Sequence, residues 1–199
     1  LLLIRQSLER ARSESAIEQL VEIATVKAVP GLITDACGQS PARIGFELDV
    51  LPVNEFQFFR GLFNPSECLD ASPLSLKVRR IKSAWEVAQL EAAAEMTRLT
   101  FDYMRTAVAP GLTEMQFAGM FETYARTIGH GGKLRVRHYN GEAYPWHVLS
   151  GSSGGLIGVL DSPASGEGTS AAFPAGAGNR RLRAAEPIMV DMGSVMNGY

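Results

Sequence analysis

An aspartate stands inside a strand-like apolar run near the end of the sequence. Asp191 belongs to the stretch IMVDMGSVMNGY, residues 188–199. Side chains alternate along an extended strand, so Asp191 shares one face with Met189 and Gly193. We expect this face to point toward packed protein. An ionised carboxylate buried there without a partner would carry a large desolvation cost, so Asp191 needs a cation, a metal ion or strong hydrogen-bond donors.

The pair Asn197–Gly198 predicts where this strand turns back. Asn-Gly is a strong signal for a two-residue hairpin turn, in which both residues adopt a positive φ. Residue 196 would then face residue 199, and by the same count position 202 would lie diagonally across from Asp191. A second carboxylate there could bind the same metal ion, or a second ion about 4 Å from the first. The alternative is a structural aspartate that accepts hydrogen bonds from backbone N–H groups at a strand irregularity next to Gly193.

The composition is that of an ordinary globular protein. The 199 residues are 46% hydrophobic and 20% charged, with a net charge of −2, so a packed core is expected and no basic excess indicates nucleic acid. All apolar runs are shorter than the ~20 residues of a membrane helix. We therefore predict no membrane or nucleic-acid partner and a cytoplasmic location. The missing initiator methionine and the end just after a turn indicate an incomplete sequence.

The two cysteines, Cys37 and Cys68, show no CxxC spacing. This spacing predicts neither a zinc site nor a disulfide framework. We interpret both as buried free thiols.

The first part of the chain alternates short apolar runs with polar, capped stretches, which predicts strands interleaved with helices. Ser15 and Glu18 have the spacing of a capping box at a helix start. The expected result is a small α/β domain that ends near Arg80, giving domains of residues 1–80 and 81–199. The predicted strands are 1–4, 42–47 and 68–72, and the predicted helices are 15–23, 29–37 and 52–63.

From Ala84 onward the pattern becomes helical. Apolar residues recur at steps of three, four and seven over about 25 residues, which predicts one long amphipathic helix. Pro110 and Gly111 end it, and Thr113 with Gln116 caps a second helix. The predicted apolar positions of the two helices are Val87, Leu90, Ala94, Phe101, Met104 and Val108, and Phe117, Phe121, Tyr124 and Ile128.

A segment rich in glycine, serine, alanine and proline follows, from Ser150 to Gly178. Its length and lack of periodicity are compatible with two roles, a loop that lines a substrate site or a mobile surface loop. The overall fold class predicted is α/β, in the broad α+β sense.

Several motifs in order along the chain resemble one family. RIKSAWEVAQLEAAAEMT (80–97), APGLTEMQFAGMFE (109–122) and EPIMVDMGSVMNGY (186–199) resemble the pita-bread metallopeptidases, which include proline dipeptidase, aminopeptidase P, methionine aminopeptidase and creatinase. RIGFELDVLP (43–52) and ECLDASPL (67–74) resemble the creatinase/prolidase N-terminal domain. The resemblance implies such an N-terminal domain followed by the first part of a pita-bread catalytic domain.

The resemblance also implies a metal centre and a substrate class. Asp191 corresponds to the first ligand of a dinuclear site of two divalent ions, with manganese, cobalt or zinc all suitable. The second aspartate comes eleven residues later, and a further histidine and two glutamates also lie past residue 199. The implied enzyme is a homodimeric Xaa-Pro dipeptidase or aminopeptidase that hydrolyses short peptides with a metal-activated water. The chain as given is expected to be inactive alone.

The family pattern has a histidine about seventeen residues before the first aspartate, and this sequence does not. Phe173, Pro174 and Ala175 occupy that neighbourhood. The histidine would stabilise charge on the scissile carbonyl, and removing such a donor costs a factor of roughly a hundred or more in rate. Two alternatives therefore stay open: a hydrolase of another C–N bond on the same fold, and a non-catalytic binding module.

The histidines that are present receive separate interpretations. His147, in YPWHVLSG, lies where the family's strand approaches the active cleft, so it is a candidate substrate contact or a half-buried structural histidine. His130 is interpreted as a helix C-terminal residue that interacts with the helix dipole. His138 has no assignment. Tyr144 and Trp146 are either pocket-lining or core residues.

Overall fold

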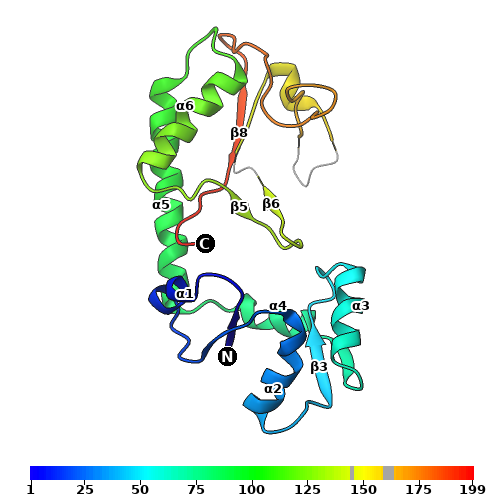
Figure 1. The fold of residues 1–199 in the computed structure, drawn as a ribbon. Helices are drawn as coiled ribbons and strands as arrows, with labels where there is room; N and C mark the ends of the chain where they lie inside the picture. The colour runs from blue at the N-terminus through cyan, green and yellow to red at the C-terminus, as the bar shows by residue number, and fades with distance from the viewer. Residues whose placement is uncertain (144–145, 159–163) are drawn as a thin grey trace. The chain divides into compact units, whose positions relative to one another are not determined.

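A computed structural model describes residues 1–143, 146–158 and 164–199. The chain forms two compact units, Leu1–Ile81 and Lys82–Tyr199. Each unit is described by itself (Figure 1). In the described residues, no helix has the length and apolar character required to cross a membrane.

The first unit consists of short parallel strand pairs and helices. Strand β1 pairs with β2, and β3 pairs with β4, both in parallel. A parallel pair requires a crossover between its strands, and helices supply it here. The elements are β1 (Leu2–Ile4), α1 (Leu8–Glu14), β2 (Leu20–Glu22), η1 (Val26–Ala28), α2 (Val29–Cys37), β3 (Arg43–Phe46), α3 (Val53–Leu62), β4 (Glu67–Asp70) and α4 (Ser72–Arg80).

The predicted helix at residues 15–23 is wrong. Ser15 is extended at the end of α1, and its Oγ accepts a hydrogen bond from the Ile17 backbone N–H at 3.0 Å. A serine that bonds the backbone two residues ahead favours a turn over a helix. Residues Leu20–Glu22 then pair with β1 as a strand, so long-range pairing overrides the local capping signal.

Aromatic packing fixes β3 against α3. The ring of Phe46 lies 5.7 Å from that of Phe56 and 6.3 Å from that of Phe63, both edge to face. Such pairs add to the stability gained from burying apolar area. The predicted strand and helix at this place are confirmed.

The second unit places two helices against a strand pair. Strands β7 and β8 are antiparallel, as are the two-residue strands β5 and β6. Figure 1 shows α5 and α6 on one side of β8 and the β5–β6 pair on the other. The elements are α5 (Ala84–Ala107), α6 (Glu114–Thr127), β5 (Leu134–Arg135), β6 (Glu142–Ala143), β7 (Trp146–Ser150), η2 (Gly151–Gly155) and β8 (Ile188–Met192).

Both predicted helices of this unit are confirmed, but of the stripe predicted for α5 only Met104 is buried. The predicted stripe includes Val87 and Leu90, which are each 42% exposed. The buried positions of α5 are Ala93, Met96, Thr100 and Met104. Ala93 and Thr100 contribute little hydrophobicity to the packed face, so a hydrophobicity pattern does not identify this face. In α6 the capping box of Thr113 and Gln116 is present as predicted.

The core of the second unit lies between α6 and the strand pair. It consists of Met104, Phe117, Phe121, Ala125, Trp146, Val148 and Leu182, with Ile188, Val190 and Met192 of β8 packed against it. The mixture of helices and strands confirms the predicted fold class.

Candidate functional site

The two strands β7 and β8 bring His147 and Asp191 together. The two residues are direct partners in the antiparallel register. Alternation along both strands puts them on the sheet face opposite the helices, because neighbouring Val148 and Val190 belong to the core side. Facing residues in such a pair have Cβ atoms about 4.5–5.5 Å apart, so an imidazole and a carboxylate share one spot on this face.

The predicted burial of Asp191 is wrong, because its side chain is exposed. Helices α5 and α6 cover the other face of β8, where Ile188, Val190 and Met192 pack. On the Asp191 face, the described residues leave the carboxylate open to solvent. The exposed side chain is therefore accessible to a ligand.

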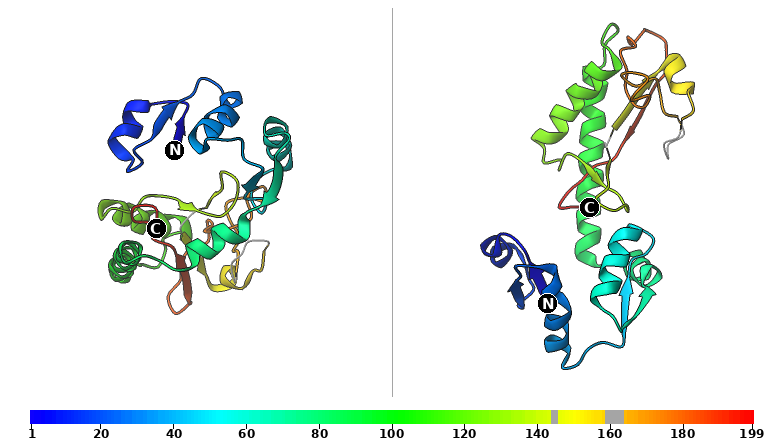
Figure 2. Two further views of the ribbon diagram at one scale, coloured as in Figure 1. Left: turned by 90° about the horizontal axis from the view of Figure 1, so that it is seen from below. Right: turned by 45° about the vertical axis from the view of Figure 1, so that its right-hand side comes forward.

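Two segments flank the His147–Asp191 pair along the strands. On one side Leu149 is fully buried, and an added Cβ at Gly166 would collide with the Leu149 Cδ2 atom, so the backbone near Gly166 covers Leu149. On the other side an added Cβ at Gly193 would lie 3.0 Å from Leu134 Cδ2 of β5. Gly166 thus lies against the residue two positions after His147, and Leu134 lies against the residue two positions after Asp191. Figure 2 shows η2, drawn in yellow, on the side away from the helices.

His147 carries an unsatisfied polar atom. Its Nδ1 is buried and has no hydrogen-bond partner in the described structure. A buried nitrogen without a partner costs free energy, and such exceptions in native proteins are often explained by a ligand or a function. This unpartnered nitrogen makes His147 a candidate site residue beside Asp191.

His130 lies just past the end of α6, as predicted, and its backbone N–H donates to the Ala125 carbonyl at 3.0 Å. Its interaction with the helix dipole stays a prediction. Helix α6 ends at Thr127, and His130 is 6% exposed with both ring nitrogens engaged. Nδ1 accepts a hydrogen bond from the Gly132 N–H at 2.8 Å, which leaves Nε2 as the donor to the Gly193 carbonyl at 3.0 Å. The ring also packs on Trp146, with centroids 4.7 Å apart. His130 thus connects the end of α6 to the chain just after Asp191.

The predicted hairpin turn at Asn197–Gly198 is confirmed. Residues Met196 and Tyr199 exchange two backbone hydrogen bonds, of 2.8 and 2.9 Å. Both central residues have positive φ, 49° for Asn197 and 84° for Gly198, as this turn type requires.

Side chains of this turn also bind the first turns of α5. Tyr199 donates its hydroxyl hydrogen to Glu86 at 2.9 Å, and Asn197 donates to Gln89 at 2.7 Å. The Tyr199 ring meets Trp85 edge to face. Long-range contacts therefore hold the chain that follows Asp191.

The remaining residues singled out in the sequence are two aromatic residues near β7, Phe173 and the two cysteines. Tyr144 lies outside the described residues. Trp146 is 9% exposed and belongs to the core, while Phe173 is 52% exposed. The prediction of buried thiols is wrong for Cys37, which is exposed, and Cys68 is half-buried.

The ligands of a metal site are only partly present. Within the described ranges, no group of three or more His, Cys, Asp or Glu side chains could hold a metal ion. Asp191 supplies one exposed carboxylate, which suits a hard divalent cation, and His147 supplies a neighbouring imidazole. These two residues alone do not complete a site.

Sequence analysis missed Glu114, which is fully buried. It is the first residue of α6, and its carboxylate contacts residues from two other segments. A glutamate in the first helical turn is ordinarily a solvated residue that complements the helix dipole. No local signal separates this case from the ordinary one.

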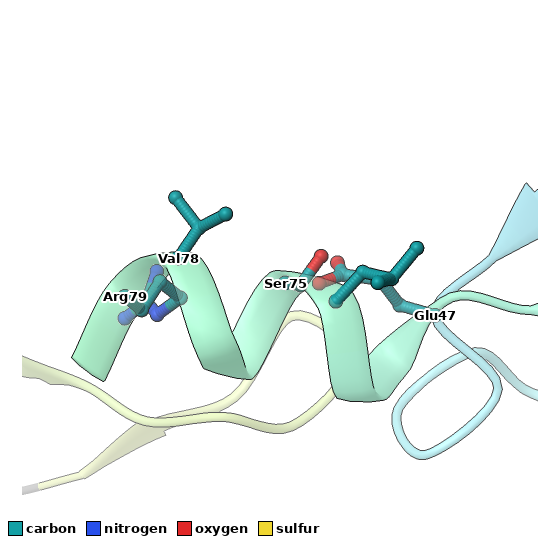
Figure 3. Close-up of a pocket in the computed structure, with 5 residues that line it drawn as sticks. Glu47, Ser75, Val78 and Arg79 are labelled. Atoms are coloured by element: carbon teal, nitrogen blue, oxygen red, sulfur yellow. The ribbon is translucent and has the colours of Figure 1, made fainter. Parts of the chain in front are cut away.

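The first unit contains a separate hollow of about 420 Å³ lined by Glu47, Leu74, Ser75, Val78 and Arg79. Figure 3 shows that Ser75 lies next to Glu47, whereas Val78 points away from both. Its residues lie in α4 and just after β3. It contains none of the candidate residues of the second unit.

Comparison with solved structures supports the fold. An Xaa-Pro dipeptidase from Bacillus anthracis superposes with a TM-score of 0.74 at 18% identity, over 96% of this chain and 47% of that protein. A prolidase from Pyrococcus furiosus gives a TM-score of 0.74 at 16% identity, over 98% of this chain and 52% of that protein. At this level of identity the likeness shows the fold alone.

Sequence comparison supports the family. An uncharacterized peptidase of Bacillus subtilis, YqhT, is 29% identical over 87 residues, which are 44% of this chain and 25% of that protein. The chain therefore spans about half the length of the solved relatives and aligns with a quarter of this one. The Creatinase/Prolidase N-terminal domain matches residues 1–81, and Metallopeptidase family M24 matches residues 88–199. Because this second match covers more than half of the chain, the protein belongs to metallopeptidase family M24 and carries a creatinase/prolidase N-terminal domain, as its motifs predict.

Proposed function

We propose that the complete protein is a metal-dependent peptidase of the Xaa-Pro dipeptidase or aminopeptidase type, acting on short peptides. The observation that carries this proposal is the pairing of exposed Asp191 with half-buried His147 on one strand face. Family membership supports peptidase chemistry. We assign residues 1–80 to the N-terminal domain and 81–199 to the catalytic domain.

Asp191 is proposed as a ligand of two divalent ions, manganese, cobalt or zinc, in the complete protein. Such ions would supply a water of lowered pKa and polarise a peptide carbonyl. His147 is proposed to bind the substrate, because its Nδ1 is buried without a partner among the described residues. The flanking segments at Leu134 and Gly166 limit the space beside the pair.

A metal titration of the complete protein tests this function. We expect about two manganese or zinc ions per chain and hydrolysis of Xaa-Pro dipeptides. Asp191→Asn should lower the metal content and reduce activity by about a hundredfold or more, as the loss of direct charge stabilisation does. Asp102→Asn, an exposed carboxylate on α5, is the matched control and should change neither.

Two results would contradict the proposal. Wild-type protein that binds no divalent ion in excess manganese or zinc would exclude the metal role of Asp191. Metal binding together with hydrolysis of amides or amidines, but not of Xaa-Pro dipeptides, would favour a hydrolase of another C–N bond. The absence of a histidine near Pro174 is the specific observation that favours this second function. The homodimer and the cytoplasmic location remain predictions.

A further inference from the structure

Four hydrogen-bond donors converge on the buried carboxylate of Glu114. Oε1 accepts from the Ser150 backbone N–H at 2.6 Å and from the Ser150 hydroxyl at 2.8 Å. Oε2 accepts from the Gly178 backbone N–H at 3.0 Å and from the Ser153 hydroxyl at 3.4 Å. Glu114 is 0% exposed. A buried carboxylate with such a set of donors is a specific feature of the fold, because each donor would be left unsatisfied without it.

The donors come from the two ends of the glycine-rich segment, defined here as residues 151–158 and 164–178. Ser150 is the last residue of β7, directly before this segment, and Gly178 is its last residue. The backbone of α6 reinforces the second end: Glu114 N–H donates to the Arg180 carbonyl at 2.9 Å, and Met115 N–H donates to the Gly178 carbonyl at 3.2 Å. One side chain therefore holds both ends of the segment on the first turn of α6.

The segment itself is ordered by backbone hydrogen bonds. Ser165 N–H donates to the Leu156 carbonyl at 2.8 Å, Gly176 N–H to the Ser165 carbonyl at 2.7 Å, and Gly168 N–H to the Gly176 carbonyl at 3.1 Å. Buried backbone groups that are paired in this way belong to a packed structure. The residues around Gly166 then cover Leu149, two positions from His147 on the same strand face.

We propose that Glu114 is a positioning residue that holds the glycine-rich segment in place as one wall of the substrate site beside His147 and Asp191. This inference rests on the proposed function for the identity of the site. Glu114 acts through Ser150, Ser153 and Gly178 and does not touch the substrate. Glutamine has the same shape but cannot replace Glu114. Its NH₂ group would point at hydrogen-bond donors, where the carboxylate oxygen of Glu114 accepts hydrogen bonds.

Kinetics of Glu114→Gln in the complete protein test the role. A displaced wall should raise KM for an Xaa-Pro dipeptide by roughly tenfold, since small misplacements of a binding group weaken substrate positioning, with kcat within about twofold. A merely structural role would lower the folded fraction, which reduces the apparent kcat and leaves KM unchanged. Glu122→Gln, on the same helix in a partly exposed ion pair with Arg126, is the control and should alter neither constant.

Amide hydrogen exchange gives a readout that does not depend on activity. In Glu114→Gln the amides of Ser165, Gly168 and Gly176 should exchange at least about tenfold faster, as expected for loss of a local closure, while those of α5 stay unchanged. Should Glu114→Gln fail to fold, the double variant Ser150→Ala, Ser153→Ala removes the two hydroxyl donors and leaves the two backbone donors. It should show a smaller change in the same direction.

The outcomes separate this inference from the proposed function. Unchanged exchange and unchanged KM in both variants would overturn the role of Glu114. A wild-type protein without peptidase activity would overturn the function, and the exchange experiment would still decide whether Glu114 holds the segment.

Discussion

His147 and Asp191 face each other directly across the β7–β8 pair. They lie on the strand face opposite the helices, between Leu134 of β5 and the backbone near Gly166. The two residues lie 44 positions apart in the sequence. Because they share one place on the strand face, a substitution at either residue tests the proposed site.

The first prediction concerns the stability and the binding role of His147. The variant His147→Phe keeps an aromatic ring and removes the buried, unpartnered Nδ1. Because an unsatisfied buried polar group costs about 1–3 kcal/mol, this variant should be as stable as the wild type or more stable. It should also raise KM for a dipeptide by about tenfold, because a tenfold change corresponds to about 1.4 kcal/mol, the contribution of one good hydrogen bond.

Chemical denaturation and steady-state kinetics of the complete protein check both parts. His138→Phe is the matched control, because His138 is exposed on another segment. A clear loss of stability in His147→Phe with an unchanged KM would identify His147 as a structural residue.

The second prediction separates the two hydrogen bonds of His130. In His130→Asn the side-chain amide can still accept from the Gly132 N–H, whereas in His130→Gln it can reach the Gly193 carbonyl. Each variant leaves a buried group unsatisfied, so each should lose about 1–3 kcal/mol of unfolding free energy. The asparagine variant should bind manganese more weakly than the glutamine variant, because it frees the backbone two residues after Asp191.

Isothermal titration with manganese, at equal folded concentration, measures this difference. Equal affinities in the two variants would show that the bond to Gly193 does not help to position Asp191. The wild type serves as the reference for both substitutions.

The third prediction concerns the contact of Gly193 with Leu134. A Cβ added at Gly193 would lie 3.0 Å from Leu134 Cδ2 and 3.1 Å from Cδ1. Gly193→Ala should therefore destabilise the protein by about 1–3 kcal/mol, the usual cost of overpacking. In a Leu134→Ala background the same change should cost less than about 0.5 kcal/mol, because its clashing partner is gone. Additive free energies in a double-mutant cycle, measured by urea denaturation, would contradict the contact.

Local signals in the sequence predicted the parts of the fold whose partners lie a few residues away. The capping box of Thr113 with Gln116 and the turn at Asn197–Gly198 both form as predicted. Each depends on groups within one turn of chain, so the residue types alone determine the geometry.

Features set by distant partners could not be predicted in the same way. Alternation placed Asp191 and Met189 on one strand face correctly, but which face the helices cover depends on the packing of α6. The donors that converge on Glu114 come from residues 36 to 64 positions away. Neither relationship leaves a periodic pattern in the sequence, because hydrophobic periodicity reports only the average burial of one element.

The last prediction is a pH dependence at the start of α5. The Ser83 backbone N–H, the Ser83 hydroxyl and the Tyr199 hydroxyl all donate to Glu86 and lower the pKa of its carboxyl below the ordinary value of 4.5. A folded-state pKa below the unfolded value means that the unfolded chain binds the proton more tightly. The stabilisation by Glu86 is therefore fully present above about pH 4.5 and is lost as the pH falls through the lowered folded-state pKa.

Thermal unfolding across the acid range tests this sign. The melting temperature of the wild type should fall more steeply below about pH 4.5 than that of Glu86→Gln, which has no proton to gain. Glu91→Gln, an exposed position on the same helix, should keep the wild-type slope. Parallel acid slopes for the wild type and Glu86→Gln would mean that the hydrogen bonds of Glu86 with Ser83 and Tyr199 do not stabilise the folded state. Because Tyr199 closes the turn that follows β8, a confirmed slope would link the first turn of α5 to the segment that carries Asp191.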